Sequence, residues 1–490
     1  MNRRIVRGSA WIGLGMGVGQ LVALGSMLVL VRLLDPASFG IVAVGVALLA
    51  VVAQVQESGL GAAVVQGRHR DPRTAAASAF VFATVAGFAF AGLVVALAPI
   101  YTTLIRLPEA TPYVQALAAV VAIRGLAVVP GALLERELDF RSRTKAELSG
   151  FVVQALVAVS CAAAGLGAWS LVGGQIAGTA AQGALMWAFA PYWPAPREAS
   201  IPVLREMLRY GRHVSGANVL VIVNNSMDNV VVGRFLGAAP LGAYSVALRL
   251  ASLPNVVIGS IVGRIMFSVY ARVQHDVAAV RAGYVQNLQR TVLLALPVTV
   301  ALGIGAEPIV LGLLGARWEE VIGPLRILAL FGLIRLVVGP SGELFKGIGR
   351  PHLALLSAVL HFCVVLPALL VLVPRFGTSG AAFALVLAVA TVAAVMMPLT
   401  LRAIELRPVE LVRALARPAA CGAIVAVALA VVVPLTNGLP PVVSMLVVVL
   451  VGGGAFLVAA AALARAVLRP IVAGLRGAPD PARVDIVPSA

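Results

Sequence analysis

Long apolar runs that recur along the whole chain constrain its fold more than any other feature. A helix that crosses the roughly 30 Å core of a bilayer needs about 20 apolar residues, and about fourteen segments meet that requirement. The chain is 61% hydrophobic and 12% charged, unlike a typical soluble domain. We therefore expect an all-α polytopic membrane protein. The predicted spans are 10–32, 41–66, 75–100, 114–135, 148–167, 170–192, 213–236, 241–268, 288–306, 323–345, 353–373, 378–401, 414–434 and 440–464.

The Lys and Arg residues of the loops orient these spans. With a cytoplasmic N-terminus, most of the 37 Lys and Arg residues fall in inner loops, as the positive-inside rule requires. The formal charge of +17 is thus a topology signal, and we expect no nucleic acid as a partner. Both termini are predicted to be cytoplasmic, with a disordered tail. The outer loops receive Arg32, Arg106, Arg234, Arg317 and Arg375.

A short pattern recurs in the two halves of the chain. RLLDPASFGIVAV begins at Arg32 and RFLGAAPLGAYSV begins at Arg234, an offset of 202 residues that also carries Gly61 onto Gly263. Six predicted spans precede the second copy, so both copies have one orientation and are related by an axis along the membrane normal. We expect two parallel six-helix lobes around a central cavity, plus two C-terminal helices. The predicted divisions are 1–197, 198–408, 409–468 and a tail, 469–490.

Polar side chains inside the predicted spans are the candidates for function, because a charge there costs about 2.5–3.5 kcal/mol and usually faces a cavity or a partner. The stretch NNSMDNVVVGRFLG, residues 224–237, leads into a hairpin that places Asp228 and Arg249 at equal depth. We expect these two residues to form an ion pair that lines a cavity; a structural pair that fixes helix packing is the alternative. The predicted polar lining of the cavity also includes Asn218, Asn224 and Asn225.

Cations outnumber carboxylates inside the spans. A guanidinium binds phosphate oxygens in a planar two-point fork, so this excess favours an anionic headgroup over a cationic drug. Salt bridges between helices are the alternative interpretation. His361 either relays protons or bonds between helices, and Arg326 is expected to reach the outer headgroups. We assign Arg124, Arg249, Arg264 and Arg335 to substrate binding, and Asp228, Glu57 and Glu343 to coupling or charge balance.

Several stretches carry a resemblance to a known family over about residues 1–430. RGSAWIGLGMGVGQLVALGSMLVLVRLLDPASFGIVAVGVALLAVVAQVQESGLGAAVVQ is similar to the opening hairpin of Wzx-type polysaccharide exporters. NNSMDNVVVGRFLGAAPLGAYSVALRLASLP resembles their seventh and eighth spans. GRPHLAL and RWEEVIGPLRILAL are also similar to segments of these exporters. They belong to the multidrug/oligosaccharidyl-lipid/polysaccharide (MOP) superfamily.

The resemblance implies the MATE-like fold of that superfamily and alternating access. It implies flipping of undecaprenyl-pyrophosphate-linked oligosaccharides across the bacterial cytoplasmic membrane for surface polysaccharide or lipopolysaccharide biosynthesis. Membrane lipids and a polysaccharide polymerase or export machinery are the other candidate partners. The alternative in the same superfamily is a cation-coupled multidrug exporter, which would need acidic residues in the first lobe, where Glu57 stands alone as a candidate.

Enzymatic functions fit the sequence less well. A membrane-embedded glycosyltransferase or polymerase commonly needs a sizeable outer loop, and the longest outer loop predicted here is 307–322. A non-transporting scaffold would leave the arginines inside the spans without a purpose. The sequence contains no nucleotide-binding motif after a strand and no metal-ligand spacing. We therefore expect a transporter rather than an enzyme, with no cofactor and no metal.

Overall fold

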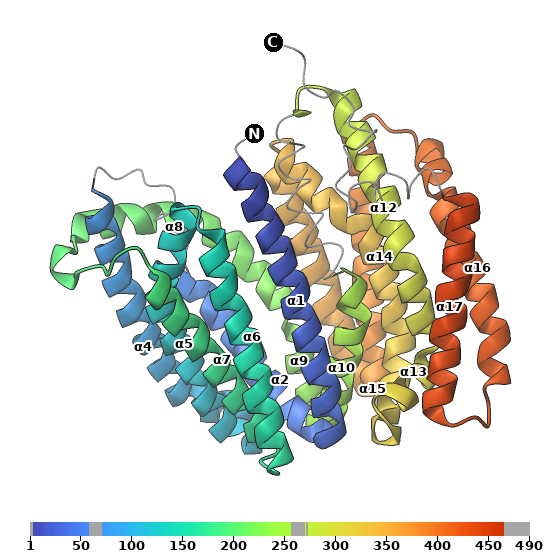
Figure 1. Cartoon of the computed structure of the whole chain (residues 1–490), viewed down its shortest axis with the longest axis horizontal. Coiled ribbons are helices and arrows are strands. Elements are labelled where there is room, and N and C mark those ends of the chain that lie inside the picture. Colours follow the sequence, from blue (N-terminus) through green and yellow to red (C-terminus); the bar gives the residue numbers. More distant parts are fainter. Residues whose placement is uncertain (1–2, 58–70, 256–269, 271–272, 465–490) are drawn as a thin grey trace. The chain divides into compact units, whose positions relative to one another are not determined.

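The computed structural model describes residues 3–57, 71–255, 270 and 273–464, and those ranges are built of helices without any strand (Figure 1). Nine helices of the described part are long and apolar enough to cross a membrane. The predicted all-α polytopic fold is therefore confirmed. Two compact units divide the chain, Met1–Ser245 and Val246–Ala490, and each is described by itself below.

Unit 1 contains the first six predicted spans and continues through the seventh. Within it α6 packs on α7 and α1, while α5 packs on α4 and α7 (Figure 1). Its last helices, α8 and α9, pack on α2. Its elements are α1 (Arg3–Leu33), α2 (Pro36–Glu57), α4 (Pro72–Leu104), η1 (Pro108–Ala110), α5 (Thr111–Arg136), α6 (Phe140–Ala163), α7 (Ala168–Phe189), η2 (Pro196–Glu198), α8 (Ile201–Asn224), α9 (Met227–Leu236) and the start of α10 (Ala238–Pro254).

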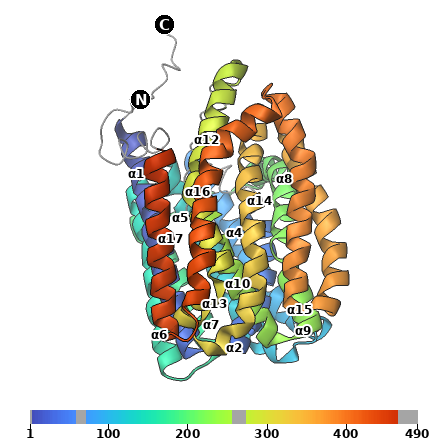
Figure 2. The ribbon, with the colours of Figure 1, turned by 90° about the vertical axis from the view of Figure 1, so that its right-hand side faces the viewer.

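Unit 2 is organised around α12 and α14. α12 packs against α14 and α16, α14 packs against α15, and the last two helices, α16 and α17, lie side by side (Figure 2). Its elements are the end of α10, α12 (Val277–Ile304), α13 (Ala306–Leu313), η4 (Ala316–Val321), α14 (Ile322–Gly347), α15 (Pro351–Ala403), α16 (Pro408–Leu435) and α17 (Pro441–Leu463).

Several helices extend beyond the predicted apolar runs, because capping groups and not hydropathy set their ends. α6 begins at Phe140, eight residues before the predicted span, because the Asp139 side chain accepts a hydrogen bond from the Ser142 N–H at 3.1 Å. Such a cap satisfies a backbone donor that the first turn of a helix leaves without a partner. The predicted outer loop 307–322 contains α13 and η4, so it is not an extended loop.

The eleventh and twelfth predicted spans are joined in one helical element, α15. The break between them falls at Gly377, whose φ of 61° and ψ of −141° lie in a region that residues with a Cβ rarely occupy. The sequence places Pro374 just before this glycine, and proline also interrupts helical hydrogen bonding. The chain therefore turns here between two long apolar helices without a loop.

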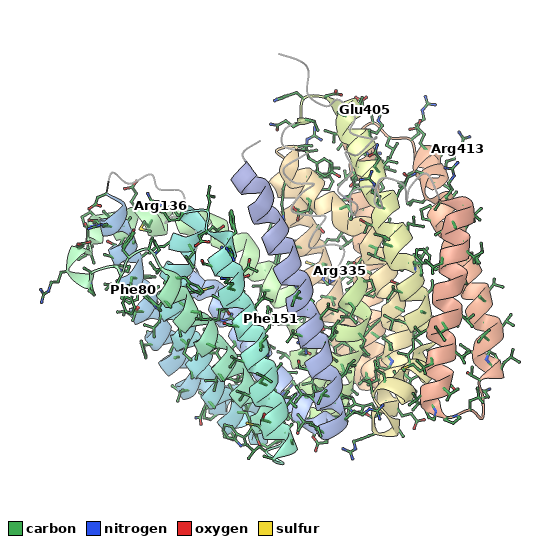
Figure 3. The ribbon with its side chains drawn as sticks, in the orientation of Figure 1. Phe80, Arg136, Phe151, Arg335, Glu405 and Arg413 are labelled. Atoms are coloured by element: carbon green, nitrogen blue, oxygen red, sulfur yellow. The ribbon has the colours of Figure 1, made fainter. Side chains whose placement is uncertain are left out.

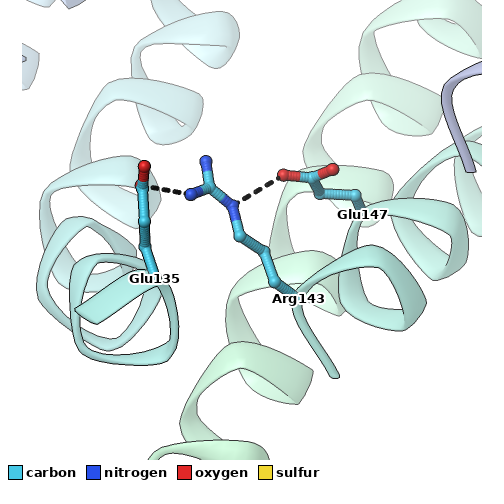
Figure 4. Close-up of polar contacts among 3 residues, drawn as sticks. All are labelled: Glu135, Arg143 and Glu147. Atoms are coloured by element: carbon cyan, nitrogen blue, oxygen red, sulfur yellow. Dashed lines mark hydrogen bonds and ion pairs between the residues drawn. The ribbon is translucent and has the colours of Figure 1, made fainter. Parts of the chain in front are cut away.

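An ion-pair network closes the connection between α5 and α6. Arg143 donates from Nε to Glu147 at 3.0 Å and from Nη1 to Glu135 (Figure 4). Glu135 lies near the end of α5, whereas Arg143 and Glu147 lie one turn apart in α6. The network therefore holds the two helices together at a loop that the charge pattern places on the inner side.

The repeat at an offset of 202 residues is visible in the helix starts. α2 begins at Pro36 and α10 begins at Ala238, which are equivalent residues in the two copies. Each is the second helix of a hairpin with a very short turn, after α1 in one case and α9 in the other. Gly61 and Gly263 lie outside the described residues. The predicted lobe boundaries at 198 and 409 stay predictions, while compact unit 1 runs on to Ser245.

Candidate functional site

The polar stretch that begins at Asn224 lies where the seventh span is interrupted. α8 ends at Asn224 and α9 begins at Met227, so the predicted continuous span over 213–236 is wrong. Asn and Ser side chains compete for backbone hydrogen bonds and disfavour a helix interior, which explains a break that an average over hydropathy misses. Interrupted helices expose backbone dipoles at membrane depth, where transporters commonly place their sites.

Asp228 lies directly after this interruption and is almost completely buried, with 2% of its surface exposed. Its Oδ2 accepts a hydrogen bond from Tyr244 Oη at 2.9 Å, and its Oδ1 accepts one from the Asn229 N–H at 2.9 Å. It occupies the first turn of α9, where the helix dipole favours a carboxylate. The Asp228 carboxylate is therefore stabilised by the Tyr244 hydroxyl and by the N-terminus of α9.

The expected ion pair between Asp228 and Arg249 is not among the ion pairs of the described residues. The hydrogen bond to Tyr244 gives the reason. Tyr244 and Arg249 are five residues apart in α10, which separates their side chains by about 140° around the helix axis. The helix face that meets Asp228 is therefore the tyrosine face, and the prediction named the wrong partner.

Tyr244 is the residue that sequence reasoning missed. It lies in the second copy of the repeat, two residues after Gly242, and has no exposed surface. A search for an opposite charge at equal depth passed over it. The signal was present, because a tyrosine hydroxyl in an apolar helix requires a hydrogen-bond partner when it is buried. The repeat-equivalent positions of Asp228 and Tyr244 are Ser26 and Val42, so the first copy lacks this pair.

Three arginines inside spans have exposed side chains: Arg124 in α5, Arg249 in α10 and Arg335 in α14. None of them forms an ion pair with another described residue. Figure 3 places Arg335 at mid-height among the helices of unit 2, whereas Glu405 and Arg413 lie at their end. No carboxylate of the described residues therefore balances these three charges.

Two other charges of the spans have protein partners. Arg326 donates to Glu307 at 3.0 Å, and both side chains are about half exposed. Glu343 pairs with Lys346 at 3.2 Å near the end of α14. Arg326 is thereby neutralised by α13 close to the end of its helix, and Glu343 is balanced by a neighbour on its own helix. Both differ in this respect from the three arginines above.

Arg335 lies beside an aromatic ring of its own helix. Its guanidinium carbon is 5.7 Å from the centroid of the Phe331 ring, one turn earlier in α14, which is a cation–π distance. His361 in α15 is another polar residue inside a span, and its buried Nδ1 has no hydrogen-bond partner within the described part of the chain. The aromatic ring orients the guanidinium without neutralising it.

The helices that carry Arg249 and Arg335 cross at Gly332. A Cβ on Gly332 would lie 3.1 Å from the carbonyl oxygen of Ala251 in α10, and Asn255 Nδ2 donates to the Gly332 carbonyl at 3.4 Å. The crossing brings α10 and α14 into close contact in unit 2. Two of the predicted binding arginines thus lie on neighbouring helices.

The remaining candidate residues stand as follows. Asn224 is 7% exposed, and Asn225 is exposed and caps the end of α8. Arg264 and the side chains of Glu57 and Asn218 lie outside the described residues. Over the ranges that the structure describes, no group of His, Cys, Asp and Glu could hold a metal ion. The roles predicted for these residues stay predictions.

Comparison with known proteins identifies sequence relatives. A family model described as "Polysaccharide biosynthesis protein" matches residues 29–323. The succinoglycan biosynthesis transport protein ExoT of Rhizobium meliloti is 28% identical over 323 residues, which are 66% of this chain and 65% of that protein. The lipopolysaccharide biosynthesis protein WzxC of Escherichia coli is 21% identical over 76% of this chain and 75% of its own. The chain thus spans just under two thirds of the first relative's length.

Solved structures share the fold at low sequence identity. The lipid II flippase MurJ in an inward closed conformation has a TM-score of 0.69 and 12% identity, covering 92% of this chain and 100% of its own. A multidrug resistance MATE family transporter of the MOP superfamily, in an inward-facing conformation, has a TM-score of 0.66 and 18% identity, covering 82% of this chain and 98% of its own. These likenesses confirm the MATE-like fold that the family resemblance implied.

Proposed function

We propose a function from the premise that the chain belongs to the polysaccharide biosynthesis protein family: it moves lipid-linked oligosaccharides across a membrane. The chain is a multi-pass membrane protein. Its relatives named above are a succinoglycan transport protein and a lipopolysaccharide biosynthesis protein. A fold shared with a lipid II flippase is compatible with cargo of this kind.

The proposed cargo is an oligosaccharide on undecaprenyl pyrophosphate, and the proposed location is the bacterial cytoplasmic membrane with both termini on the cytoplasmic side. The positive-inside pattern of the loops supports that orientation. Transport proceeds by alternating access, with the headgroup carried through the interior and the lipid tail left in the bilayer. A polysaccharide polymerase or export complex would take up the cargo on the outer side.

The observation that carries the proposal is the set of unpaired arginines inside spans, Arg124, Arg249 and Arg335. A charge at membrane depth is costly unless it meets a partner or water, and the described residues provide no carboxylate for these three. A pyrophosphate supplies the missing negative charge and matches the planar fork of a guanidinium. Arg335, oriented by Phe331, is the residue best placed to bind it.

A cationic drug is disfavoured as the cargo by the same residues. Three uncompensated positive charges would repel it, and the buried carboxylate of Asp228 is already engaged by Tyr244 and the Asn229 N–H. The likeness to multidrug MATE transporters therefore concerns the fold, while the charge distribution favours an anionic substrate. This is the physical difference between the two candidate functions.

The first experiment deletes the gene in its host. Lipid-linked intermediates are then extracted and surface polysaccharide is quantified. We expect glycan on undecaprenyl carriers to accumulate on the cytoplasmic face while surface polymer is lost. Unchanged glycolipids and unchanged polymer, in a host without a second copy of the gene, would contradict the proposal.

The binding role of Arg335 is tested by complementing this deletion. Loss of a hydrogen bond to a charged group costs about 1.5–3 kcal/mol, which corresponds to roughly 10- to 100-fold in affinity. We therefore expect Arg335→Ala to abolish most export and Arg335→Lys to restore part of it, because lysine keeps the charge but not the fork. Arg326→Ala is the matched control, since Arg326 is already paired with Glu307, and it should export normally. Equal export by Arg335→Ala and Arg326→Ala would remove Arg335 from the site.

A further inference from the structure

The two copies of the repeat touch one another at equivalent residues. Gly40 in α2 and Gly242 in α10 are separated by the repeat offset of 202 residues. A Cβ on Gly40 would overlap the carbonyl oxygen of Ala238 and lie 3.0 Å from the Gly242 nitrogen. A Cβ on Gly242 would overlap the carbonyl oxygen of Pro36 and lie 3.1 Å from the Gly40 nitrogen. Pro36 and Ala238 are themselves equivalent, so each half of the contact repeats the other.

This reciprocity fixes where the contact lies. Residues that contact their own equivalents must lie on the axis that relates the two copies. In a protein with parallel repeats that axis runs along the membrane normal. A path for cargo between the two copies would follow the same axis. The crossing of the first turns of α2 and α10 therefore obstructs such a path at the end where each hairpin turns, which is the predicted outer end.

The contact is made by backbone atoms and not by interlocking side chains. Glycine allows helices to approach this closely, and weak contacts between Cα hydrogens and carbonyl oxygens accompany such crossings.

Contacts between α9 and the end of α4 lie next to this crossing. Arg234 Nη1 donates to the Leu104 carbonyl at the end of α4, and a Cβ on Gly233 would lie 3.3 Å from Ile105 and 3.4 Å from Leu107. The Asp228–Tyr244 hydrogen bond ties α9 to α10 just beside it. Because α10 continues past Ser245 as one helix to Pro254, a movement of its first turn is carried along the whole helix.

We propose that the reciprocal contact of Gly40 and Gly242 is the outer gate of the transport path: it seals the outer end when the two first turns meet and opens when they separate. The proposal rests on the transport function proposed above. The proposal states that closure requires glycine at both repeat-equivalent positions, because a methyl group on either residue prevents the same contact.

The test measures access to a buried residue beside the gate. Cys161, Cys363 and Cys421 are replaced by alanine, and a single cysteine is introduced as Ala243→Cys, at a position in α10 with no exposed surface. A membrane-impermeant maleimide is added from the outside of intact cells. We expect slow labelling in this parent and a several-fold faster rate after Gly40→Ala or Gly242→Ala, with the two substitutions giving the same increase.

Matched controls separate gate opening from a general loss of packing. Gly25→Ala in α1 should leave the labelling rate unchanged, because a Cβ there meets no atom within 4 Å. A cysteine introduced as Met207→Cys reports on the core of unit 1, where Met207 is 1% exposed. It should stay protected from a permeant maleimide in every gate variant.

Three outcomes would overturn the proposal. The first is an unchanged labelling rate at Ala243→Cys in both gate variants, and the second is an increase in one gate variant alone. The third is an increase in labelling at Met207→Cys that equals the increase at Ala243→Cys. The readout does not depend on the cargo. If labelling is unchanged but the gene deletion stops polysaccharide export, the gate proposal fails and the transport function stands. If labelling increases as expected but the deletion leaves lipid-linked glycans unchanged, the transport function fails and the glycine contact stands.

Discussion

The hydrogen bond between Tyr244 and Asp228 gives a prediction whose magnitude can be derived from the structure. Tyr244→Phe removes one hydroxyl that donates to Asp228 at 2.9 Å, where neither side chain exposes more than 2% of its surface. Hydrogen bonds to charged groups are worth about 1.5–3 kcal/mol, whereas side-chain bonds between membrane helices average about 0.6 and reach about 1.7 kcal/mol. The Asn229 N–H still donates a hydrogen bond to the carboxylate after the substitution. We therefore expect a loss of about 1.5 kcal/mol in the free energy of unfolding.

The assay is reversible unfolding in mixed micelles, carried out as a double-mutant cycle with Asp228→Ala. Once the carboxylate is gone, Tyr244→Phe should cost less than about 0.5 kcal/mol, because the hydroxyl has already lost its acceptor. Tyr101→Phe is the matched control. Its hydroxyl donates to the neutral carbonyl of Val44 at 3.1 Å, so its loss should cost about 0.6 kcal/mol. An equal cost of Tyr244→Phe with and without Asp228 would refute the assigned interaction.

Four further changes can be checked by unfolding or hydrogen exchange. Gly377→Ala should destabilise unit 2 by about 1–3 kcal/mol because its φ is 61°. Gly342→Ala in α14, where a Cβ meets nothing within 4 Å, should instead stabilise it by about 0.5–1 kcal/mol, and a loss there would contradict the reasoning. Arg143→Met should cost under about 1 kcal/mol, and less at high salt, since its partners are partly exposed. Hydrogen bonds from the Thr74 side chain and the Arg73 N–H lower the pKa of Asp71, so the cap of α4 should strengthen above about pH 4, where the unfolded carboxyl ionises. The protection factors of its first-turn amides should therefore be lower at about pH 3 than at about pH 6, and Asp71→Asn should remove that difference.

Hydropathy and charge predicted the membrane-spanning architecture because both are summed over many residues. Twenty apolar residues in a row have few alternatives to a membrane helix. The same averaging hides single-residue decisions. The break at Asn225 is set by local competition for backbone hydrogen bonds, and the turn at Gly377 by one dihedral angle. Each is encoded by one or two residues inside a window of twenty.

The sequence predicted which residues belong to the candidate site better than it predicted their interaction partners. Intramembrane position selected Arg124, Arg249 and Arg335, and all three are exposed without a carboxylate partner in the described ranges. The partner of Asp228 was not predictable from depth, because depth ignores the direction in which a side chain leaves its helix. Tyr244 and Arg249 are five residues apart in α10, so they differ by about 140° in direction and by about 7.5 Å along the helix axis.

The reciprocal glycine contact also limits how the two copies of the repeat can differ. Positions that accommodate any side chain are free to differ between the copies, as Asp228 and Tyr244 differ from Ser26 and Val42. Gly40 and Gly242 are not free in this sense, because a mutation in either copy collides with the backbone of the other. The backbone of each copy thus excludes a side chain at the equivalent glycine of the other copy. New side chains can therefore be accommodated in one half of the repeat, whereas the point of mutual contact requires glycine in both halves.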